Sequence, residues 1–347
     1  MMAGVLTNIL LLALLVFILI LVIRSRRLFA VVVLAGAYSL VSAAMFVNLD
    51  AVDVAFTEAA VGAGISTVLF LAAMAYLPGA EKTPPEAKGL GHILPALVIC
   101  CLAGALLILA AIELPPVGDP LAPPHVHVAP RYLEESRSFL HIPNVVTTVL
   151  ASYRGFDTFG ETVVVFTAGL GVLVLLAGAT RTARAARTGS DKGGKGVAAM
   201  RDNPILRVCA KILFAPIIVF GLYVQFHGDY GPGGGFQAGV IIAAAFILYS
   251  LVFGLEAGRR IVPGWASLAM LALGVIIYGG VGVAGMMLDG LFLDYNVLAS
   301  DASKGQHYGI LLVEFGVGLT VTGVMLALFH AFAGFVESDY RAGGGEG

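Results

Sequence analysis

The sequence predicts an all-α integral membrane protein with about nine transmembrane helices, and two observations support this fold class. Hydrophobic residues make up 59% of the 347 residues and charged residues only 12%, a composition too apolar for the surface of a soluble protein. The apolar residues also fall in uninterrupted runs of about 20 residues, the length that an α-helix needs to cross the hydrocarbon core of a bilayer. A soluble enzyme is therefore excluded.

Each run is expected to be helical because backbone groups in lipid must form hydrogen bonds within their own segment. The expected spans are residues 5–23, 28–47, 54–77, 92–112, 158–180, 206–227, 235–256, 264–287 and 307–335. The first run is followed by the basic cluster Arg24, Arg26 and Arg27, whereas a signal peptide has its positive charge before the apolar stretch. We therefore expect the first run to be a retained span.

The basic residues predict the orientation of these spans. If the N-terminus lies outside, the segments that face the cytoplasm hold 15 of the 20 Lys and Arg residues, and the outer segments hold four. Cytoplasmic loops of membrane proteins carry such an excess of basic residues. The sequence thus predicts a multi-pass protein of the cell (inner) membrane with its N-terminus out and its C-terminus in. The basic residues follow topology and indicate no nucleic-acid partner.

Two polar segments divide the chain into modules. Residues 113–157 form an external stretch that ends in the short, apolar and β-branched run from Asn144 to Tyr153, which favours an interfacial or re-entrant helix over a full span. Residues 181–205 are polar and Gly-rich and predict a cytoplasmic linker. We expect a 3+2+4 arrangement of helices, with a three-helix module in 1–112, one or two spans in 113–180 and a four-helix module in 206–347.

The cysteines and the motif content argue against metal or cofactor chemistry. Cys100, Cys101 and Cys209 lie in expected spans without CxxC spacing or a neighbouring His, so we interpret them as small core residues rather than ligands or disulfide partners. No cofactor motif and no nucleophile with a base at useful spacing is present in the sequence. We therefore expect no cofactor, no metal and no enzymatic activity of the chain itself.

Glu58 is the first ionisable residue that the apolar spans do not explain. A charged side chain at the centre of a span costs at least about 2.5 kcal/mol, so that such residues pair with a partner or have a function. Asp50 and Asp53 precede Glu58 at the outer mouth of the third span, where they could cap the helix and favour its dipole. Glu58 lies too deep to cap, and Asp53 with Glu58 could instead begin a proton relay.

Three further charged residues lie at the entry of the fifth span. Arg154 could pair with Asp157, and Asp157 shares a helix face with Glu161 because the two are four residues apart. Both carboxylates are also electrostatically favourable near a helix N-terminus. A structural role and a role in ion translocation are both open here.

Lys211 and Glu314 lie within the sixth and ninth spans. Lys211 is about one turn from the cytoplasmic side, so its long side chain could reach the interface or, if buried, could exchange protons. Glu314 lies about two turns inside the outer end of its span, and a carboxylate reaches the interface less easily than a lysine. His330 lies near the inner end of the same span, and we interpret it as an interfacial residue.

The loop between the sixth and seventh spans has the sequence FHGDYGPGGGFQAG. Glycine allows backbone conformations and close approaches that other residues do not, so we expect a structural loop that packs tightly or presents backbone groups to an ion. The residues of this structural loop are His227, Asp229, Pro232, Gly233, Gly234 and Gly235. It is not a phosphate-binding loop because no Gly-Lys-Ser/Thr follows, and His227 with Asp229 is too weak a pattern for a metal site.

In the predicted orientation, the carboxylates of the charged residues described above fall at or within the outer half of the membrane, namely those of Asp53, Glu58, Asp157, Glu161, Asp229 and Glu314. The candidate ion-pathway residues are Asp53, Glu58, Arg154, Asp157, Glu161, Lys211 and Glu314. We therefore hypothesise a hydrated cavity that opens outward and is completed on the cytoplasmic side by other subunits.

Three motifs resemble one group of membrane complexes. NLDAVDVAFTEAAVGAG resembles the first, MbhD-like module of multi-subunit cation/proton antiporters and membrane-bound hydrogenases, and NVVTTVLASYRGFDTFGE resembles the second, MbhE-like module. FGLYVQFHGDYGPGGGFQAGV resembles the small MnhB-like subunit of Mrp/Mnh-type Na⁺/H⁺ antiporters. The three modules account for nearly all of the chain, which is therefore similar to a fusion of the C-terminal part of a large antiporter subunit with the MnhB-like one.

The resemblance implies a subunit that exchanges H⁺ for Na⁺ in a complex with other antiporter membrane subunits, embedded in the lipid bilayer. It also implies that Asp53, Glu58, Asp157 and Glu161 line part of the ion path. Many antiporter large subunits have Gln at the position of Glu58, so the carboxylate is nearer the hydrogenase pattern. The alternatives are thus a membrane-arm subunit of an energy-converting hydrogenase or related complex-I-like oxidoreductase, or a purely structural subunit.

Overall fold

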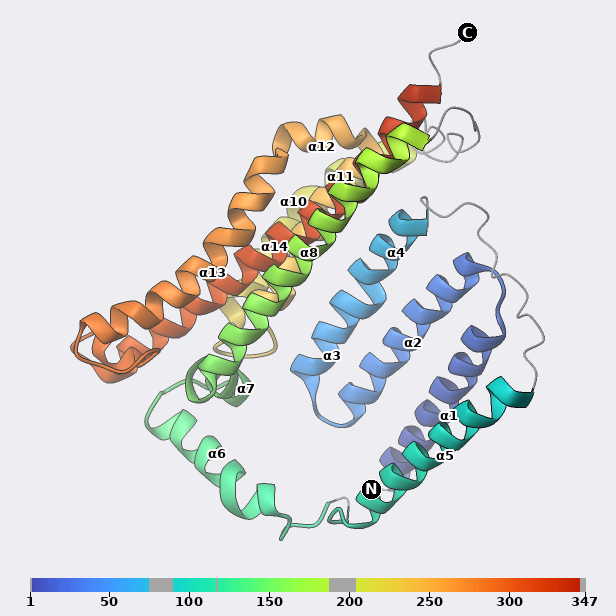
Figure 1. Ribbon diagram of the computed structural model, residues 1–347. Coiled ribbons are helices and arrows are strands. Elements are labelled where there is room, and N and C mark those ends of the chain that lie inside the picture. Colours follow the sequence, from blue (N-terminus) through green and yellow to red (C-terminus); the bar gives the residue numbers. More distant parts are fainter. Residues whose placement is uncertain (1, 75–89, 117, 187–203, 344–347) are drawn as a thin grey trace.

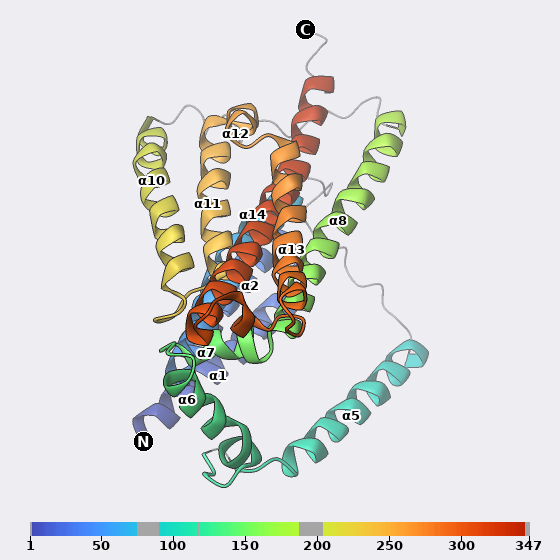
Figure 2. The same ribbon diagram turned by 90° about the vertical axis from the view of Figure 1, so that its left-hand side faces the viewer.

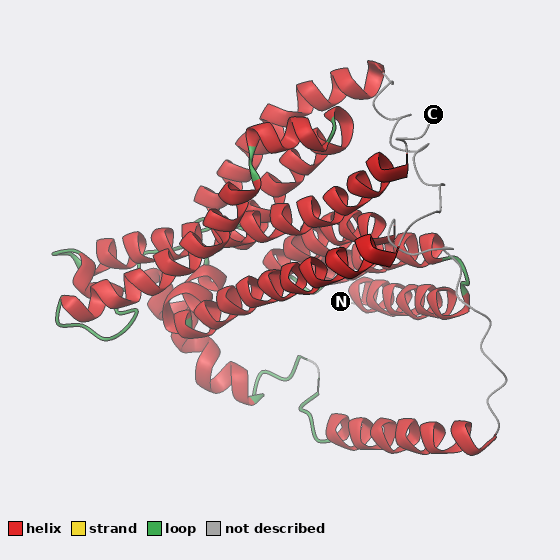
Figure 3. Cartoon of the chain, turned by 45° about the horizontal axis from the view of Figure 1, so that its top comes forward, coloured by secondary structure: helices red, strands yellow, loops and turns green. Residues whose placement is uncertain are grey.

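The computed structural model describes residues 2–74, 90–116, 118–186 and 204–343, which form helices joined by loops (Figure 1). Figure 3 shows helices and loops and no strand in these ranges. Within them, nine helices are long and apolar enough to cross a membrane, which confirms the predicted fold class. The spans are formed by α1 (Met2–Arg24), α2 (Leu28–Asn48), a composite helix Val52–Met74, α5 (Leu90–Ile112), α8 (Gly155–Ala186), α10 (Pro204–His227), α11 (Gly235–Phe253), α13 (Gly264–Met287) and α14 (Ala302–Gly343).

The third span is not a uniform α-helix, contrary to the continuous helix expected over 54–77. It consists of α3 (Val52–Glu58), the π-helical segment η1 (Ala59–Ile65) and α4 (Ser66–Met74). A π-helical turn is wider than an α-helical turn, and such turns inside α-helices occur frequently at functional sites. The wider turn begins directly after Glu58, so the distortion lies at the carboxylate that the sequence analysis selected.

Helix α14 is the centre of the C-terminal bundle, as Figure 2 shows. In its most apolar stretch 67% of the residues are buried, compared with 11% for α8 and for α10. Helices α8, α11 and α13 pack around it, and buried side chains such as Tyr278, Ile310 and Phe329 fill the space between them. The ninth span therefore lies within protein over much of its length, which is the setting in which a polar residue of a span can be retained.

Glycines allow α13 and α14 to approach each other closely. A Cβ atom on Gly274 of α13 would overlap the carbonyl oxygen of Gly316 and the hydroxyl of Thr320 on α14. Small residues at such crossings let the helix backbones touch, and this contact helps to drive helix association in lipid, where apolar burial gives little net gain. The close crossing fixes the position of α14, and with it Glu314, relative to the rest of the bundle.

The segment between α5 and α8 lies at one end of the bundle, together with the loops 228–234 and 288–301 (Figure 1). It contains η2 (Pro124–Val128), α6 (Ala129–Ser138), α7 (Val145–Thr148) and the π-helical η3 (Val149–Tyr153). Asn144 to Tyr153 is thus a short helical connection and not a span, so the described residues of 113–180 provide a single span, α8. Four spans lie before residue 113, so the expectation of three helices in 1–112 is wrong. The opposite end of the bundle carries α12 (Leu255–Ile261), which follows α11 after Gly254 takes a φ of 99°.

Helix α5 stands apart from the other spans, as Figures 2 and 3 show from two directions. None of its most apolar stretch, Leu94–Ile112, is buried within this chain. Cys100 and Cys101 lie on this helix and, like Cys209 of α10, are free and exposed. The prediction that the cysteines are core residues is wrong, because the helices that carry them present most of their surface outward.

The predicted linker over residues 181–205 is described only in part. Helix α8 continues through Ala186, beyond the expected end of its span at residue 180, and α10 begins at Pro204. Residues 187–203 lie outside the described residues.

Candidate functional site: a junction of three modules

The glycine-rich loop between α10 and α11 forms the base of the candidate site. Gly234 has a φ of 122°, a left-handed conformation that favours glycine, and its N–H donates to the Val224 carbonyl at 3.1 Å. A Cβ atom on the next residue, Gly235, would overlap the backbone carbonyl of Glu314. The glycines therefore place the loop and the start of α11 directly against α14, as the sequence predicts for close packing.

Asp53 connects the first module to this loop. Its Oδ1 accepts a hydrogen bond from the Gly233 N–H at 3.2 Å. Residues of 50–54, 143–146 and 230–232 line a pocket of about 360 Å³ beside this contact. The pocket therefore has walls from all three modules, and Asp53 lies in it rather than acting only as a helix cap.

Asn144 connects the second module to the same loop. Its Nδ2 donates to the carbonyls of Gly228 and Gly231, each at 2.9 Å, and its Oδ1 accepts from the Val146 N–H, which caps α7. The Thr147 hydroxyl donates to the Gly228 carbonyl at 2.7 Å. Buried polar groups are costly when unpaired, so these bonds satisfy the loop carbonyls and hold α7 against the loop.

Glu314 projects toward the loop from α14. A Cβ atom on Gly228 would lie 2.9 Å from its Oε2, and one on Gly234 would lie 3.3 Å from its Oε1. Asp229 and Asp53 are close enough to interact electrostatically with the Glu314 carboxylate. No hydrogen bond or ion pair to this carboxylate is present among the residues that the structure describes. Three carboxylates thus meet at the loop, and the deepest of them has no fixed partner.

Asp229 pairs with His307, a residue that the sequence analysis did not select. Asp229 Oδ2 and His307 Nδ1 are 2.6 Å apart, and the side chains are 10% and 44% exposed, respectively. Burial raises the pKa of the Asp229 carboxyl, and the attraction of His307 opposes this shift. Asp229 and His307 are 78 positions apart in the sequence, and no spacing pattern predicts the pair, because it depends on how α14 packs beside the loop.

Glu58 lies farther along the third span than Asp53. A Cβ atom on Gly62 would overlap both the Glu58 carboxylate and the Ser39 hydroxyl of α2, so these groups share a small space next to the π-helical segment. Within the described part of the chain, the Glu58 carboxylate has no hydrogen bond or ion pair. It is partly exposed rather than buried.

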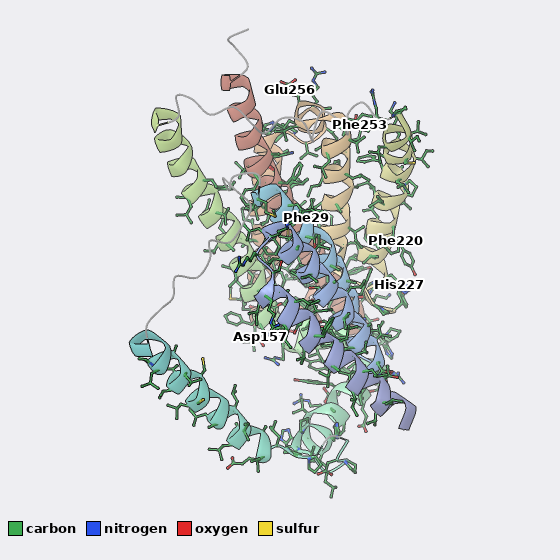
Figure 4. The ribbon with its side chains drawn as sticks, turned by 90° about the vertical axis from the view of Figure 1, so that its right-hand side faces the viewer. Phe29, Asp157, Phe220, His227, Phe253 and Glu256 are labelled. Atoms are coloured by element: carbon green, nitrogen blue, oxygen red, sulfur yellow. The ribbon has the colours of Figure 1, made fainter. Side chains whose placement is uncertain are left out.

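Arg154, Asp157 and Glu161 lie elsewhere. Arg154 Nε donates to Asp157 Oδ2 at 2.7 Å, and the two side chains are 63% and 52% exposed. Figure 4 shows Asp157 and His227 on different flanks of the bundle. Glu161 is also exposed, on the same helix as Asp157. The structure therefore gathers Asp53, Asp229 and Glu314, whereas Arg154, directly before α8, and Asp157 and Glu161 on α8 are exposed.

Two buried tyrosines connect α8 to the C-terminal bundle near the site. The Tyr278 hydroxyl donates to the Gly155 carbonyl at 2.8 Å, and the Tyr295 hydroxyl donates to the Ala151 carbonyl at 2.9 Å. These carbonyls lie where η3 meets α8 and the regular helical bonding pattern is interrupted. Both tyrosines were missed in the sequence, where nothing distinguishes them from other aromatic residues in apolar surroundings.

Lys211 is exposed on α10, and its Nζ lies 5.7 Å from the centre of the Phe253 ring, within the range of a cation–π contact. Lys211 is therefore not buried within this chain, contrary to one of its two interpretations.

His227 stacks on Tyr223 with ring centres 4.8 Å apart. His330, expected at an interface, is 5% exposed, and its Nδ1 has no hydrogen-bond partner among the described residues. The described residues contain no group of three or more His, Cys, Asp or Glu side chains suited to a metal ion.

Comparisons with known proteins agree with the three-module organisation. The family model described as a domain related to the MnhB subunit of the Na⁺/H⁺ antiporter matches residues 205–327. The models for the MBH subunits MbhD and MbhE match residues 13–79 and 101–191. The three matches follow one another along the chain in the order expected from the motifs.

Relatives and a solved structure show the same similarity. The chain is 30% identical over 139 residues to a putative antiporter subunit mnhB2 of Staphylococcus aureus, covering 39% of this chain and 98% of that protein. It is 28% identical over 340 residues to a probable K⁺/H⁺ antiporter A/B subunit of Rhizobium meliloti, covering 89% of this chain and 32% of that protein. A chain of the Mrp complex from Dietzia sp. DQ12-45-1b superposes with a TM-score of 0.70 at 28% identity, over 93% of this chain and 34% of that one.

The chain also spans 66% of the length of an uncharacterized Methanocaldococcus jannaschii protein, to which it is 29% identical over 178 residues, 49% of this chain. It spans about a third of the Rhizobium and Dietzia chains.

The fold and the three matched modules define a multi-pass membrane subunit of the transporter class. More narrowly, the chain belongs to the MnhB family of Mrp/Mnh-type antiporter subunits, and its MnhB domain is preceded by modules related to MbhD and MbhE of the membrane-bound hydrogenase.

Proposed function

We propose that this chain is a subunit of a multi-subunit complex that exchanges a monovalent cation for protons, and that the three-module junction provides an outward-facing acidic part of the ion pathway. The observation that carries the proposal is the meeting of Asp53, Asp229 and Glu314 at the loop 228–234. Neighbouring carboxylates cannot all remain ionised at low cost. Such a cluster therefore takes up and releases protons as a nearby positive charge arrives or leaves.

Glu314 is the residue on which we expect the exchange to depend most. It lies in the most buried span and it lacks a fixed partner among the described residues. A carboxylate locked in an ion pair would have its charge compensated permanently, whereas Glu314 is free to respond to a proton or a passing cation. Glu58 provides a second candidate position farther along the pathway.

The orientation and the partners are part of the same proposal. With the N-terminus out and the C-terminus in, the junction faces the outside of the cell membrane. The cluster lies at one end of the bundle only, so the pathway requires further membrane subunits on the cytoplasmic side. A complex that carries these subunits exchanges Na⁺ or another monovalent cation for H⁺ across the membrane.

The test is cation-dependent proton exchange in membrane vesicles that contain the assembled complex. Glu314→Gln removes the titratable group and keeps the shape of the side chain, so we expect at least about a 10-fold loss of exchange with normal assembly. Glu134→Gln is the matched control because Glu134 is exposed on α6, and we expect it to match the wild type. Full exchange by the Glu314 variant would favour a purely structural role for this chain.

A further inference from the structure

The loop 228–234 does not need the His307–Asp229 pair to hold it in place. The loop is already held by Asn144, by Thr147 and by the Gly233–Asp53 hydrogen bond. The pair adds a contact whose two members differ in exposure, since the His307 side chain is 44% exposed and that of Asp229 is 10% exposed. One end of the pair thus meets solvent, and the other end leads into the protein.

The inner end of the pair lies next to Glu314. Asp229 directly follows Gly228, which lies against the Glu314 carboxylate. A Cβ atom added to Gly228 would lie 2.9 Å from Glu314 Oε2. Asp229 also acts electrostatically on the Glu314 carboxylate. His307, Asp229 and Glu314 therefore form a sequence of titratable groups that runs from solvent to the junction.

We propose that His307 and Asp229 form the proton-loading pair through which protons reach and leave Glu314. Histidine suits the outer position because its two ring nitrogens can accept a proton on one side and release one on the other near neutral pH. Water protonates His307 at Nε2, the Nδ1 proton passes to Asp229 Oδ2, and the ring returns to its neutral form. The resulting carboxylic acid then gives its proton to the Glu314 carboxylate, and Asp229 is again ionised.

The other titratable groups around the pair set its electrostatic environment. Lys304 lies one turn before His307 on α14, where residues three apart share a helix face. Tyr295 packs its ring against Gly309, two residues beyond His307, and Asp53 approaches from α3 through Gly233. Thr147 of α7 and the capping residue Asn144, which both bind the loop, are uncharged. Burial also raises the pKa of the Asp229 carboxyl, which favours the proton-carrying state that the sequence of transfers requires.

The test compares three substitutions in the assembled complex by the pH profile of cation-dependent proton exchange in vesicles. His307→Gln keeps a polar side chain without a titratable group, and we expect exchange to fall about 5- to 10-fold, most strongly at high pH where free protons are scarce. His307→Arg keeps a positive charge beside Asp229 but cannot release its proton, so we expect normal assembly and the same loss. His127→Gln, at an exposed histidine of η2, is the control and should match the wild type.

A structural pair gives a different pattern. Restored exchange in the His307→Arg variant, or an unchanged pH profile in the assembled His307→Gln variant, would overturn the proposal. If His307→Gln does not assemble, the His307→Arg variant decides alone. The inference rests on the proposed function, and the wild type separates the two: a wild-type complex without cation–proton exchange refutes both, whereas normal exchange in both His307 variants refutes the proton-loading pair only.

Discussion

At the residue scale, the acidic side chains of this protein divide into paired and unpaired groups. Asp157 is held by Arg154 on the exposed surface of α8, and an exposed ion pair of this kind contributes about 1 kcal/mol or less. Glu58 and Glu314 lie in spans without hydrogen-bond or ion-pair partners among the described residues. An unpaired carboxylate in a span is destabilising, and this cost is the reason that the proposed ion pathway includes both residues.

This difference leads to a prediction for Glu58 and Glu161. Glu58→Gln should reduce cation-dependent proton exchange about 10-fold, because Glu58 lies at the π-helical turn within the third span. Glu161→Gln should have a smaller effect, because Glu161 is exposed on α8. Both variants should assemble normally by native gel electrophoresis. Equal effects of the two substitutions, or no effect of Glu58→Gln, would show that the different positions of Glu58 and Glu161 do not affect proton exchange.

Sequence patterns predicted some of these residues and could not predict others. Glu58 and Glu314 stand out because a single charge in an apolar run is visible without any knowledge of packing. His307 does not stand out, because it follows the charged stretch at 301–304 at the start of the ninth span, and its partner is distant in the chain. Asn144 was recognised only as the start of a short helix, since the carbonyls that it binds belong to a loop more than 80 residues later.

At the scale of elements, the spans were predictable because each depends on local composition. The π-helical turn at Ala59–Ile65 was not predicted, since the surrounding helices and not the local hydropathy determine whether a turn widens. The cysteines were misassigned for a related reason. An apolar run predicts a span but does not predict which of its faces the rest of the chain covers, and α5 is covered by none of the described helices along its most apolar stretch.

The crossing of α13 and α14 gives a prediction for this scale. Gly274→Ala introduces a Cβ atom that overlaps backbone and side-chain atoms of α14, and overpacking of this kind typically costs about 1–3 kcal/mol. We expect a lower melting temperature of the purified complex and reduced exchange, because Glu314 shifts with α14. Gly280→Ala on the same helix is the control, since no atom of the described neighbouring residues lies within 4 Å of its added Cβ, and it should not be destabilising. Equal melting temperatures for the two variants would contradict the close crossing.

At the scale of the whole molecule, α1 begins at one end of the bundle and α14 ends at the other (Figure 1), as the nine spans in the described residues require. The loops 228–234 and 288–301 share one end with α6 and α7, and α12 lies at the opposite end. The distribution of basic residues predicts that the first of these ends faces outward. The structure fixes the relative placement of the loops, and the charge pattern supplies the direction.

Cysteine labelling tests this orientation. In a chain with Cys100, Cys101 and Cys209 replaced by Ala, Ser300→Cys should react with a membrane-impermeant maleimide added to intact cells. Glu256→Cys, on α12, should react only after the membrane is permeabilised. The reverse pattern would invert the topology and would place the acidic junction on the cytoplasmic side.

The three modules meet at a site that none of them forms alone. Asp53 comes from the first module, and Asp229 and Glu314 come from the third. The second module contributes Asn144, which donates hydrogen bonds to the loop carbonyls. A single chain fixes the stoichiometry of these groups and keeps them together during assembly. The central claim is that carboxylates from different modules act as one unit in proton exchange.

A double-mutant cycle on Asp53→Asn and Glu314→Gln tests this claim most directly. Groups that act as a unit show strongly non-additive effects. We therefore predict that the double variant exchanges cations for protons no more slowly than the less active of the two single variants, with all complexes fully assembled. Multiplication of the two single losses in the double variant, or wild-type exchange in either single variant, would contradict the account.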